Sequence, residues 1–270
     1  MNFIEAVETA WGKNNSLVCV GLDPDISKIP SHLREVENPL FEFNKAIVDA
    51  TSDLVCAFKP QMAYYSAAQA EQDLFLTIEY IHENHPGIPV ILDAKRGDIG
   101  STAEMYAKEV FDRYQADAVT VNPYLGEDSL RPFLKRKGKG VIILCRTSNP
   151  GSRDLQALES NGEKLFRIVA RKASTEWNVN DNILLVVGAT FPEELKEIRS
   201  IVGEMPLLVP GIGAQGGDVE RAVVNGKTQN GTGMIINSSR GIIYSSQGDD
   251  FAEAARKATK TLRDEINRWR

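Results

Sequence analysis

Two acids and a lysine lie close together in the chain, directly after an apolar run. Asp93 and Lys95 follow the β-like run 88–92, and Asp98 comes three residues later in a loop that contains glycines. Because side chains alternate along a strand, Asp93 and Lys95 are expected on the same face, about 7 Å apart along the strand. An ammonium group between carboxylates keeps its proton, and the carboxylates stay ionised. The spacing therefore predicts a cluster of acid and base groups at the end of a strand.

This cluster is expected where a strand gives way to a helix. Gly97 and Gly100 predict a tight loop, and Ser101 or Thr102 is expected to cap a helix that begins at Ala103. In barrels of alternating strands and helices, such junctions are the usual place for catalytic groups.

Eight short apolar runs alternate with helical patterns from end to end. The runs cover residues 17–22, 54–58, 88–92, 118–122, 140–145, 183–187, 206–209 and 234–237. Strands that are apolar on both faces are typical of a parallel sheet covered by helices, and eight of them close a barrel. We therefore predict an α/β fold, a single (β/α)8 TIM barrel domain over residues 1–270, with an extra amphipathic helix at the N-terminus.

An open, doubly wound sheet is the alternative fold. Such sheets carry a glycine fingerprint for dinucleotides directly after the first strand. Here the first run ends in Gly21-Leu22-Asp23-Pro24, which does not match that fingerprint. The barrel is therefore the preferred interpretation.

The composition is that of a globular protein with an acidic balance. The chain has 42% hydrophobic and 25% charged residues and a net charge of −6 at pH 7, which disfavours nucleic acid and anionic membranes as partners. The first residues lack the pattern of a signal peptide, and no apolar run approaches the ~20 residues of a membrane span. The three cysteines lie in apolar runs, as buried reduced thiols do. We expect a cytoplasmic protein.

Polar residues follow several of the predicted strands, and in a barrel they would share one rim. These residues are Asp23, Lys59, Asp93, Lys95, Asp98, Ser148, Gln215 and Arg240. Charges of opposite sign compensate one another where water is excluded. A structural network of salt bridges would explain the same residues without a function, and that alternative stays open. The three histidines lie away from the rim, which disfavours histidine acid–base chemistry and a histidine-built metal site.

The glycine-rich segment 210–217 indicates an anion site. Glycines let the backbone approach an anion, and the helix that follows offers its amide groups. Barrels often bind phosphate between the loops after strands seven and eight, and Arg240 follows the eighth strand. A phosphorylated small substrate is predicted, with a flexible turn and a surface arginine as the alternative.

These segments resemble the orotidine 5′-phosphate decarboxylase family. The Asp93-x-Lys95-x-x-Asp98 core and the residues 99–102 after it look like the signature of that family. The resemblance continues through residues 58–60, 148–151, 210–217 and 239–244, in the same order. The length of the chain and the residues of the core, Asp-Ala-Lys-Arg-Gly-Asp, resemble the longer bacterial branch of the family. The core alone is also shared by related sugar-phosphate decarboxylases and synthases.

The resemblance implies a homodimeric barrel without cofactor or metal that converts orotidine 5′-phosphate to uridine 5′-phosphate in de novo pyrimidine biosynthesis. Lys95 would donate the proton to C6 of the pyrimidine, and Asp93 would lie beside the departing carboxylate. Lys59 would orient Asp93 and contact the ribose. Asp98 and Thr102 would reach into the site of the partner subunit, so that both chains build each site.

The resemblance also implies a set of substrate-binding residues. Asp23 would bind ribose hydroxyls and Ser148 the pyrimidine edge, while Gln215 and Arg240 would bind the phosphate. The segment 151–182 is longer and more polar than in compact members of the family, and the sequence assigns it no role.

Two other functions stay open at this point. A metal-dependent sugar-phosphate decarboxylase or synthase would use Asp93 and a further acid to hold Mg²⁺, but Lys59 at the second strand end would compete with the cation. A barrel that only binds a phosphorylated ligand, with an inert charge network, is the non-enzyme alternative.

Overall fold

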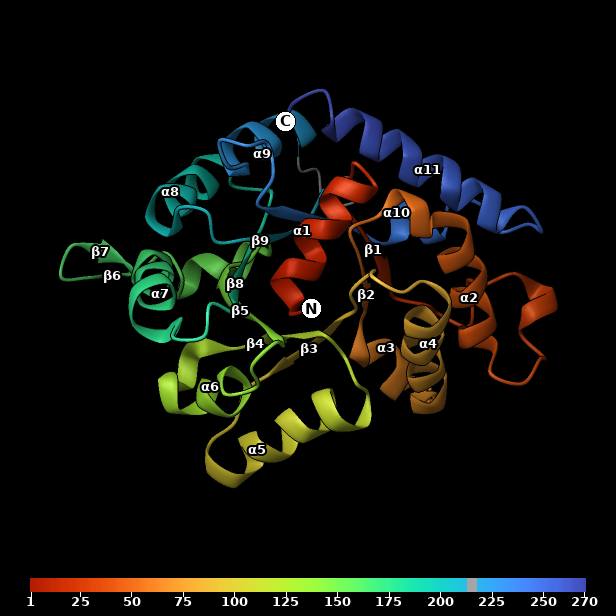
Figure 1. Ribbon diagram of the computed structural model, residues 1–270, viewed down its shortest axis with the longest axis horizontal. Helices are drawn as coiled ribbons and strands as arrows, with labels where there is room; N and C mark the ends of the chain where they lie inside the picture. Colours follow the sequence, from red (N-terminus) through yellow and green to blue (C-terminus); the bar gives the residue numbers. More distant parts are fainter. Residues whose placement is uncertain (213–217) are drawn as a thin grey trace.

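Eight parallel strands form the centre of the molecule (Figure 1), a computed structural model that describes residues 1–212 and 218–270. The strand order is β2-β1-β10-β9-β8-β5-β4-β3. Parallel bridges from Phe58 to Val90 and from Gln61 to Asp93 join the two edges of the sheet. The barrel strands are β1 Val18–Leu22, β2 Ala57–Pro60, β3 Ile91–Arg96, β4 Ala118–Val121, β5 Gly140–Arg146, β8 Ile183–Val187, β9 Leu207–Pro210 and β10 Met234–Ser238. The predicted (β/α)8 barrel is confirmed.

The barrel strands are buried on both faces, as their apolar sequences predict. Every residue of β1, β2, β4 and β8 is buried. One face of each strand fills the barrel and the other packs on the surrounding helices, which is why these strands are apolar runs rather than alternating patterns. Exposure rises most at the carboxyl end of β3, where the chain leaves the sheet, and the last residues of β9 and β10 are half-buried.

Helices surround the barrel, and most follow a strand in the chain (Figure 1). The helices are α1 Phe3–Lys13, α2 Pro39–Thr51, α3 Met62–Ala67, α4 Glu71–Asn84, α5 Gly100–Lys108, α6 Glu127–Leu134, α7 Leu165–Lys172, α8 Pro192–Val202, α9 Val219–Gly226, α10 Arg240–Ile243 and α11 Phe251–Ile266. Short 3-10 turns lie at Ser31–Leu33, Ser52–Leu54, Pro123–Leu125 and Pro150–Asp154, and π-turns extend α5 and α7 over Glu109–Arg113 and Ala173–Trp177.

The predicted N-terminal helix is confirmed as α1, which lies across the ring of strands (Figure 1). Asn2 and Glu5 form a capping box at its start. Phe3 donates its amide to the carbonyl of Gly138 at 2.9 Å. A Cβ on Gly140, the first residue of β5, would lie 2.3 Å from the Phe3 ring. The helix therefore covers the end of the barrel where the strands begin, opposite the end that holds their carboxyl termini.

The expected cap of the helix after β3 is wrong. Helix α5 begins at Gly100, its N-cap is Ile99, and no side chain caps it. Gly100 has φ +53°, a conformation that favours glycine, and it lets the chain enter the helix before Ser101 is reached. Ser101 and Thr102 therefore lie in the first turn, where their side chains are exposed.

The segment between β5 and α7 has a structure of its own. A 3-10 turn at Pro150–Asp154 is followed by a small antiparallel hairpin, β6 Glu159–Ser160 and β7 Glu163–Lys164. The amide of Phe166 donates to the carbonyl of Gln156 at 3.0 Å, which ties the segment to the first turn of α7. The segment thus folds back over the carboxyl end of β5.

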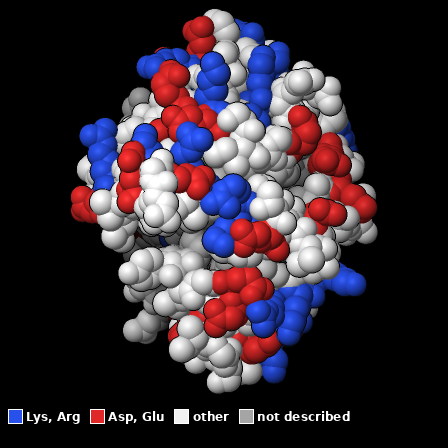
Figure 2. Space-filling view, turned by 90° about the vertical axis from the view of Figure 1, so that its left-hand side faces the viewer, with Lys and Arg blue, Asp and Glu red and all other residues white. Residues whose placement is uncertain are grey.

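Figure 2 shows the face of the molecule that carries α7 and α8, where basic and acidic side chains are interspersed. None of the helices in residues 1–212 and 218–270 is both long and apolar enough to cross a lipid bilayer.

Cys19, Cys56 and Cys145 are buried free thiols, as predicted. Burial raises the pKa of the Cys19 thiol to about 12, so it stays protonated and unreactive.

Candidate active site

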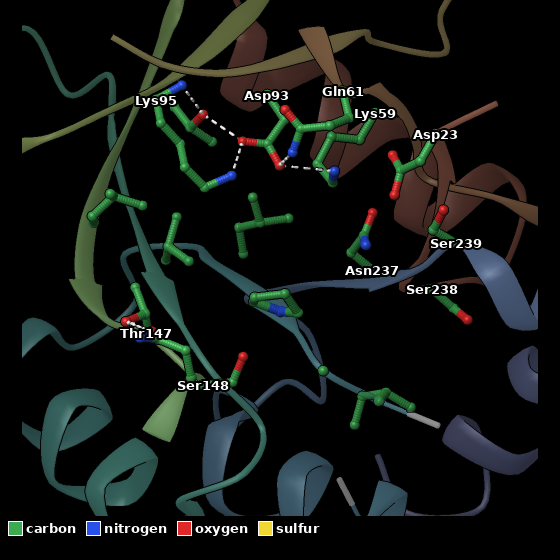
Figure 3. A pocket seen from close by; sticks show the side chains of 18 of the residues that line it. Asp23, Lys59, Gln61, Asp93, Lys95, Thr147, Ser148, Asn237, Ser238 and Ser239 are labelled. Carbon is green, nitrogen blue, oxygen red and sulfur yellow. Dashed lines mark hydrogen bonds and ion pairs between the residues drawn. The ribbon is translucent and has the colours of Figure 1, made fainter. Parts of the chain in front are cut away.

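A cavity of about 500 Å³ opens at the carboxyl ends of the barrel strands (Figure 3). Strand ends and loops from around the barrel contribute its polar lining, which consists of Asp23, Lys59, Gln61, Asp93, Lys95, Thr120, Thr147, Ser148, Asn149, Gln156, Asn237, Ser238, Ser239 and Arg240. Leu144, Val186, Leu208, Pro210 and Ile212 add apolar surface. A concave site with few charged groups and apolar walls suits a small polar ligand.

Asp93 is the centre of the charge cluster. Its Oδ2 accepts hydrogen bonds from Lys59 Nζ and Gln61 Nε2, both at 3.0 Å. Its Oδ1 accepts from Lys95 Nζ and Thr120 Oγ1, both at 2.7 Å. The exposed fraction is 7% for Asp93 and 4% for Lys59. A buried carboxylate thus has an ammonium group on each of its oxygens.

Burial and the neighbouring charges act in opposite directions on these groups. Burial disfavours the Asp93 carboxylate, but Lys59 and Lys95 outweigh that effect and lower its pKa. Burial likewise disfavours the Lys59 ammonium, yet Asp93 and then Asp23 raise its pKa. Asp93 and Lys59 therefore stay charged across the physiological pH range.

Lys95 reaches Asp93 through an irregular strand end rather than a regular strand. The register of β3 against β4 shifts between Leu92 and Arg96, and Lys95 has φ +45°. Its amide donates to Thr120 Oγ1 at 3.0 Å, and the same hydroxyl donates to Asp93. The two side chains share the cavity as expected, but a bulge brings them together. Such a backbone conformation persists only where the surrounding contacts impose it.

Arg96 holds the end of this irregular strand. Its Nε and Nη2 donate to the carboxylate of Glu109 at 2.9 Å each, and its guanidinium lies 4.7 Å from the centre of the Tyr106 ring. Both partners lie on α5 or its π-turn. The helix after β3 therefore fixes the strand end that carries Lys95.

Three buried oxygens at the cavity have no hydrogen-bond partner among the described residues. They are Oδ1 of Asp23, Oδ1 of Asn237 and Oγ of Ser239, and Figure 3 shows the three side chains near one another. Buried polar atoms normally have partners. Two of these oxygens are acceptors only, so a ligand with hydroxyl groups would satisfy them.

The loops after β9 and β10 face the same cavity, as the sequence predicts for the seventh and eighth barrel strands. Pro210, Gly211 and Ile212 line it at the end of β9, and Ser239 and Arg240 line it where the chain passes from β10 into α10. Gln215, a predicted member of this site, lies outside the described residues.

Asp98 and Thr102 are not brought to this cavity by their own chain. Neither is among the described residues that line it. Asp98 Oδ1 accepts from the amide of Ile99 at 2.8 Å, and Thr102 is exposed on α5. The charge cluster predicted from the sequence therefore holds Asp93 and Lys95 but not the second acid. His32, His82 and His85 pair with aspartates away from the cavity, as expected.

Several residues of the site were not predicted. Gln61 and Thr120 bind Asp93, while Gln156 and Asn237 line the cavity. All four are neutral, and single neutral polar residues are common in loops and strand ends. Thr120 is a polar residue inside an otherwise apolar run, and this was the one available signal.

Comparisons with known proteins show the family to which this chain belongs. A family model described as orotidine 5′-phosphate decarboxylase / HUMPS family matches residues 16–258. The chain is 62% identical over its full length and that of an orotidine 5′-phosphate decarboxylase of Dechloromonas aromatica, and 59% identical over the same extent to one of Ralstonia nicotianae. An OMP decarboxylase structure from Leishmania donovani superposes with a TM-score of 0.85 at 37% identity, covering 99% of this chain and 98% of that one. The chain therefore belongs to the orotidine 5′-phosphate decarboxylase family, and it is a carbon–carbon lyase that decarboxylates orotidine 5′-phosphate in pyrimidine biosynthesis.

Proposed function

We propose that Lys95 donates the proton that replaces the lost carboxylate at C6, and that the reaction needs no cofactor or metal. One observation carries this proposal: the Lys95 ammonium lies 2.7 Å from a buried carboxylate in the cavity. An ammonium held there meets negative charge as it develops on the substrate and has a proton to give.

The reaction balances with Lys95 as the acid. The bond between C6 and the carboxylate breaks, CO₂ leaves, and the electron pair stays in an sp² orbital at C6. That carbon takes a proton from Lys95, and the resulting amine regains one from water. At about 4 Å and an effective dielectric near 20, the attraction between ammonium and carbanion is worth up to ~4 kcal/mol. Enzymes lower barriers by roughly 8–23 kcal/mol, so binding energy from the phosphate end must supply much of the rest.

Asp93 and Lys59 complete the reacting end of the site in this proposal. Asp93 lies beside the departing carboxylate, and their repulsion is relieved as CO₂ leaves. Lys59 orients Asp93 and contacts the ribose. The 3.0 Å ion pair between the two, with both side chains buried, supports these roles.

The remaining residues bind the substrate. Asp23 accepts from ribose hydroxyls, which its unpartnered buried Oδ1 supports. Ser148 contacts the pyrimidine edge from the loop after β5, and Arg240 binds the phosphate from the start of α10. Gln215 is assigned to the phosphate with Arg240 on the sequence alone.

The charges around Asp93 favour chemistry without a metal. Both of its oxygens already face ammonium groups, Lys59 on one and Lys95 on the other. A divalent cation bound to this carboxylate would have to approach two positive charges, at a cost that grows as water is excluded. This arrangement disfavours the metal-dependent alternative.

We also propose a homodimer in which Asp98 and Thr102 enter the site of the partner subunit. Large apolar side chains are exposed next to them in the chain, Ile99 at 59% and Met105 at 54%, and Tyr124 in the loop after β4 is 75% exposed. Exposed large apolar side chains are typical of an interface when they form a patch. A second copy covering them would bring Asp98 to the other site.

The wider setting follows from general properties. We propose that residues 1–270 act as one barrel domain in the cytoplasm and bind neither nucleic acid nor membranes. The family match over residues 16–258, the net charge of −6 and the buried free thiols support this proposal.

The test follows the loss of orotidine 5′-phosphate absorbance in the ultraviolet. We expect protein stripped of metal, assayed in EDTA, to be fully active. Lys95→Ala should lose at least a factor of about 10²–10⁴ in kcat. Lys108→Ala removes an exposed lysine of α5 and should have the kcat of the wild type. Restoration of a lost activity by Mg²⁺, or near-normal turnover of Lys95→Ala, would refute the proposal.

A further inference from the structure

We propose that Arg146 and Gln156 are positioning residues that hold Thr147 and Ser148 against the pyrimidine end of the cavity. The inference rests on the proposed contact between Ser148 and the pyrimidine edge. It gives the segment after residue 150 a role in substrate recognition, which the sequence did not assign.

Arg146, the last residue of β5, is a buried charge that joins two loops. Its exposed fraction is 1%. Its Nε donates to Glu194 Oε2 at 2.5 Å, in the first turn of α8, and its Nη1 donates to Ser152 Oγ in the turn after β5. Its guanidinium also lies 4.2 Å from the centre of the Phe191 ring. The arginine therefore ties the start of α8 to the segment that follows β5.

Gln156 carries this connection to the cavity wall. Its Oε1 accepts from the amide of Thr147 at 2.8 Å, and its Nε2 donates to Thr147 Oγ1 at 2.9 Å. Arg146 Nη1 lies 3.4 Å from the same Oε1. The amide of Gln156 donates to the carbonyl of Ser152 at 2.9 Å. One side chain thus holds both the backbone and the hydroxyl of the residue before Ser148, and it lines the cavity itself.

Gly188, directly after β8, confines Ser148 from the other side. A Cβ on Gly188 would lie 2.9 Å from the amide nitrogen and the Cβ of Ser148. The Gly188 amide donates to the carbonyl of Arg146 at 2.7 Å. Ser148 is therefore confined by Gly188 on one side and by its chain neighbour Thr147, which Gln156 holds, so it has little freedom to shift along the cavity wall.

Stability alone does not explain an arginine at this position. A buried ion pair is often no more stabilising than apolar residues of similar volume. An arginine provides several donors in a fixed plane, so it can bind Glu194 and Ser152 at the same time. That directional link fixes the loop that carries Ser148, which an apolar side chain would not do.

The test compares two ligands by calorimetry: uridine 5′-phosphate, the product, and ribose 5-phosphate, which lacks the base. We expect Gln156→Ala to weaken the binding of uridine 5′-phosphate about tenfold. Its affinity for ribose 5-phosphate should stay within about twofold of the wild-type value. Arg146→Lys, which cannot bridge Glu194 and Ser152, should act in the same direction. Arg167→Met is the matched control because it removes an exposed ion pair to Glu197 between α7 and α8, and it should change neither affinity.

A double-mutant comparison separates this inference from the proposed role of Ser148. Ser148→Ala should weaken the binding of uridine 5′-phosphate but not that of ribose 5-phosphate. Adding Gln156→Ala should cause little further loss of affinity, because both substitutions act on one contact. Thermal unfolding confirms that each variant is folded. Additive losses, equal losses for both ligands, or normal affinity of Gln156→Ala would overturn the positioning role alone. Normal affinity of Ser148→Ala would refute the proposed pyrimidine contact and this inference with it.

Discussion

Asp93 is the residue on which the charges of the site depend. It is the one carboxylate in the described part of the cavity that binds two lysines, and its side chain is buried. Removing its charge would leave the buried Lys59 ammonium with less compensation. Uncompensated buried charge is among the larger costs that a single substitution causes.

Asp93→Asn should lower the free energy of unfolding at pH 7 by about 3–5 kcal/mol. Because the folded protein lowers the pKa of Asp93, the stability it contributes is present above the ordinary carboxyl pKa near ~4. That stability is lost as the pH falls toward the folded value. The difference in stability between wild type and variant should thus be constant above about pH 5 and shrink below about pH 4. Urea unfolding at a series of pH values measures it; a difference unchanged down to pH 3 would contradict the expectation.

Arg240 belongs to the phosphate end and should affect binding only through that group. Hydrogen bonds to charged groups contribute about 1.5–3 kcal/mol. Arg240→Ala should therefore weaken the binding of uridine 5′-phosphate roughly 10- to 100-fold. Binding of uridine, which lacks the phosphate, should not change. Arg268→Ala, at an exposed arginine after α11, is the control. Calorimetry measures both affinities. If the binding of uridine weakens as much as that of the nucleotide, the assignment is wrong.

Among the elements, the ends of the strands decide the site more than the strands themselves. The end of β3 bulges at Lys95 and is anchored by Arg96, which binds Glu109 in the π-turn after α5. The ends of β5 and β8 approach so closely that Gly188 meets Ser148 with no room for a side chain. Regular strand geometry would produce neither contact.

Gly188→Ala should therefore disturb the site from outside the cavity. Its methyl group would lie 2.9 Å from the Ser148 backbone, and such overpacking costs about 1–3 kcal/mol. We expect a lower melting temperature and weaker binding of uridine 5′-phosphate. Gly12→Ala in α1 is the matched control, since nothing lies within 4 Å of its new Cβ, and it should stabilise the helix by about 0.5–1 kcal/mol. Equal behaviour of the two variants would show that the β5–β8 contact does not constrain Ser148.

At the scale of the whole molecule, a single chain builds only part of the proposed site. The barrel brings Asp93, Lys95 and Lys59 together but leaves Asp98 and Thr102 outside the cavity. The apolar side chains Ile99 and Met105, which lie near them in the chain, are exposed. A symmetric dimer through this surface would complete two sites at once.

Mixing two inactive variants tests this assembly. Lys95→Ala and Asp98→Asn homodimers should each lose most activity. A heterodimer of the two would hold one site with both changes and one intact site, so a statistical mixture should recover about a quarter of wild-type activity. Subunit exchange must be verified by mass spectrometry. Verified heterodimers without any recovery would count against shared sites.

The sequence alone determined the barrel and the charged residues of its rim. Each of its eight runs is almost entirely apolar because each strand is buried on both faces. Charged residues at strand ends, such as Asp93, Lys95 and Lys59, were predictable because charges are rare there without partners. The order of these runs also places Asp23 and Arg240 on the same rim.

Only the tertiary structure decided which groups touch. Closure of the sheet brings β2 beside β3, so Gln61 reaches Asp93 across 32 residues of chain. The bulge at Lys95, the link from Arg146 to Glu194 and the distance of Asp98 from its own site depend on the same closure and packing. A local pattern records whether a residue is buried, because burial acts on each side chain separately. The partner of a polar atom depends on where distant strands meet, and no local pattern contains that information.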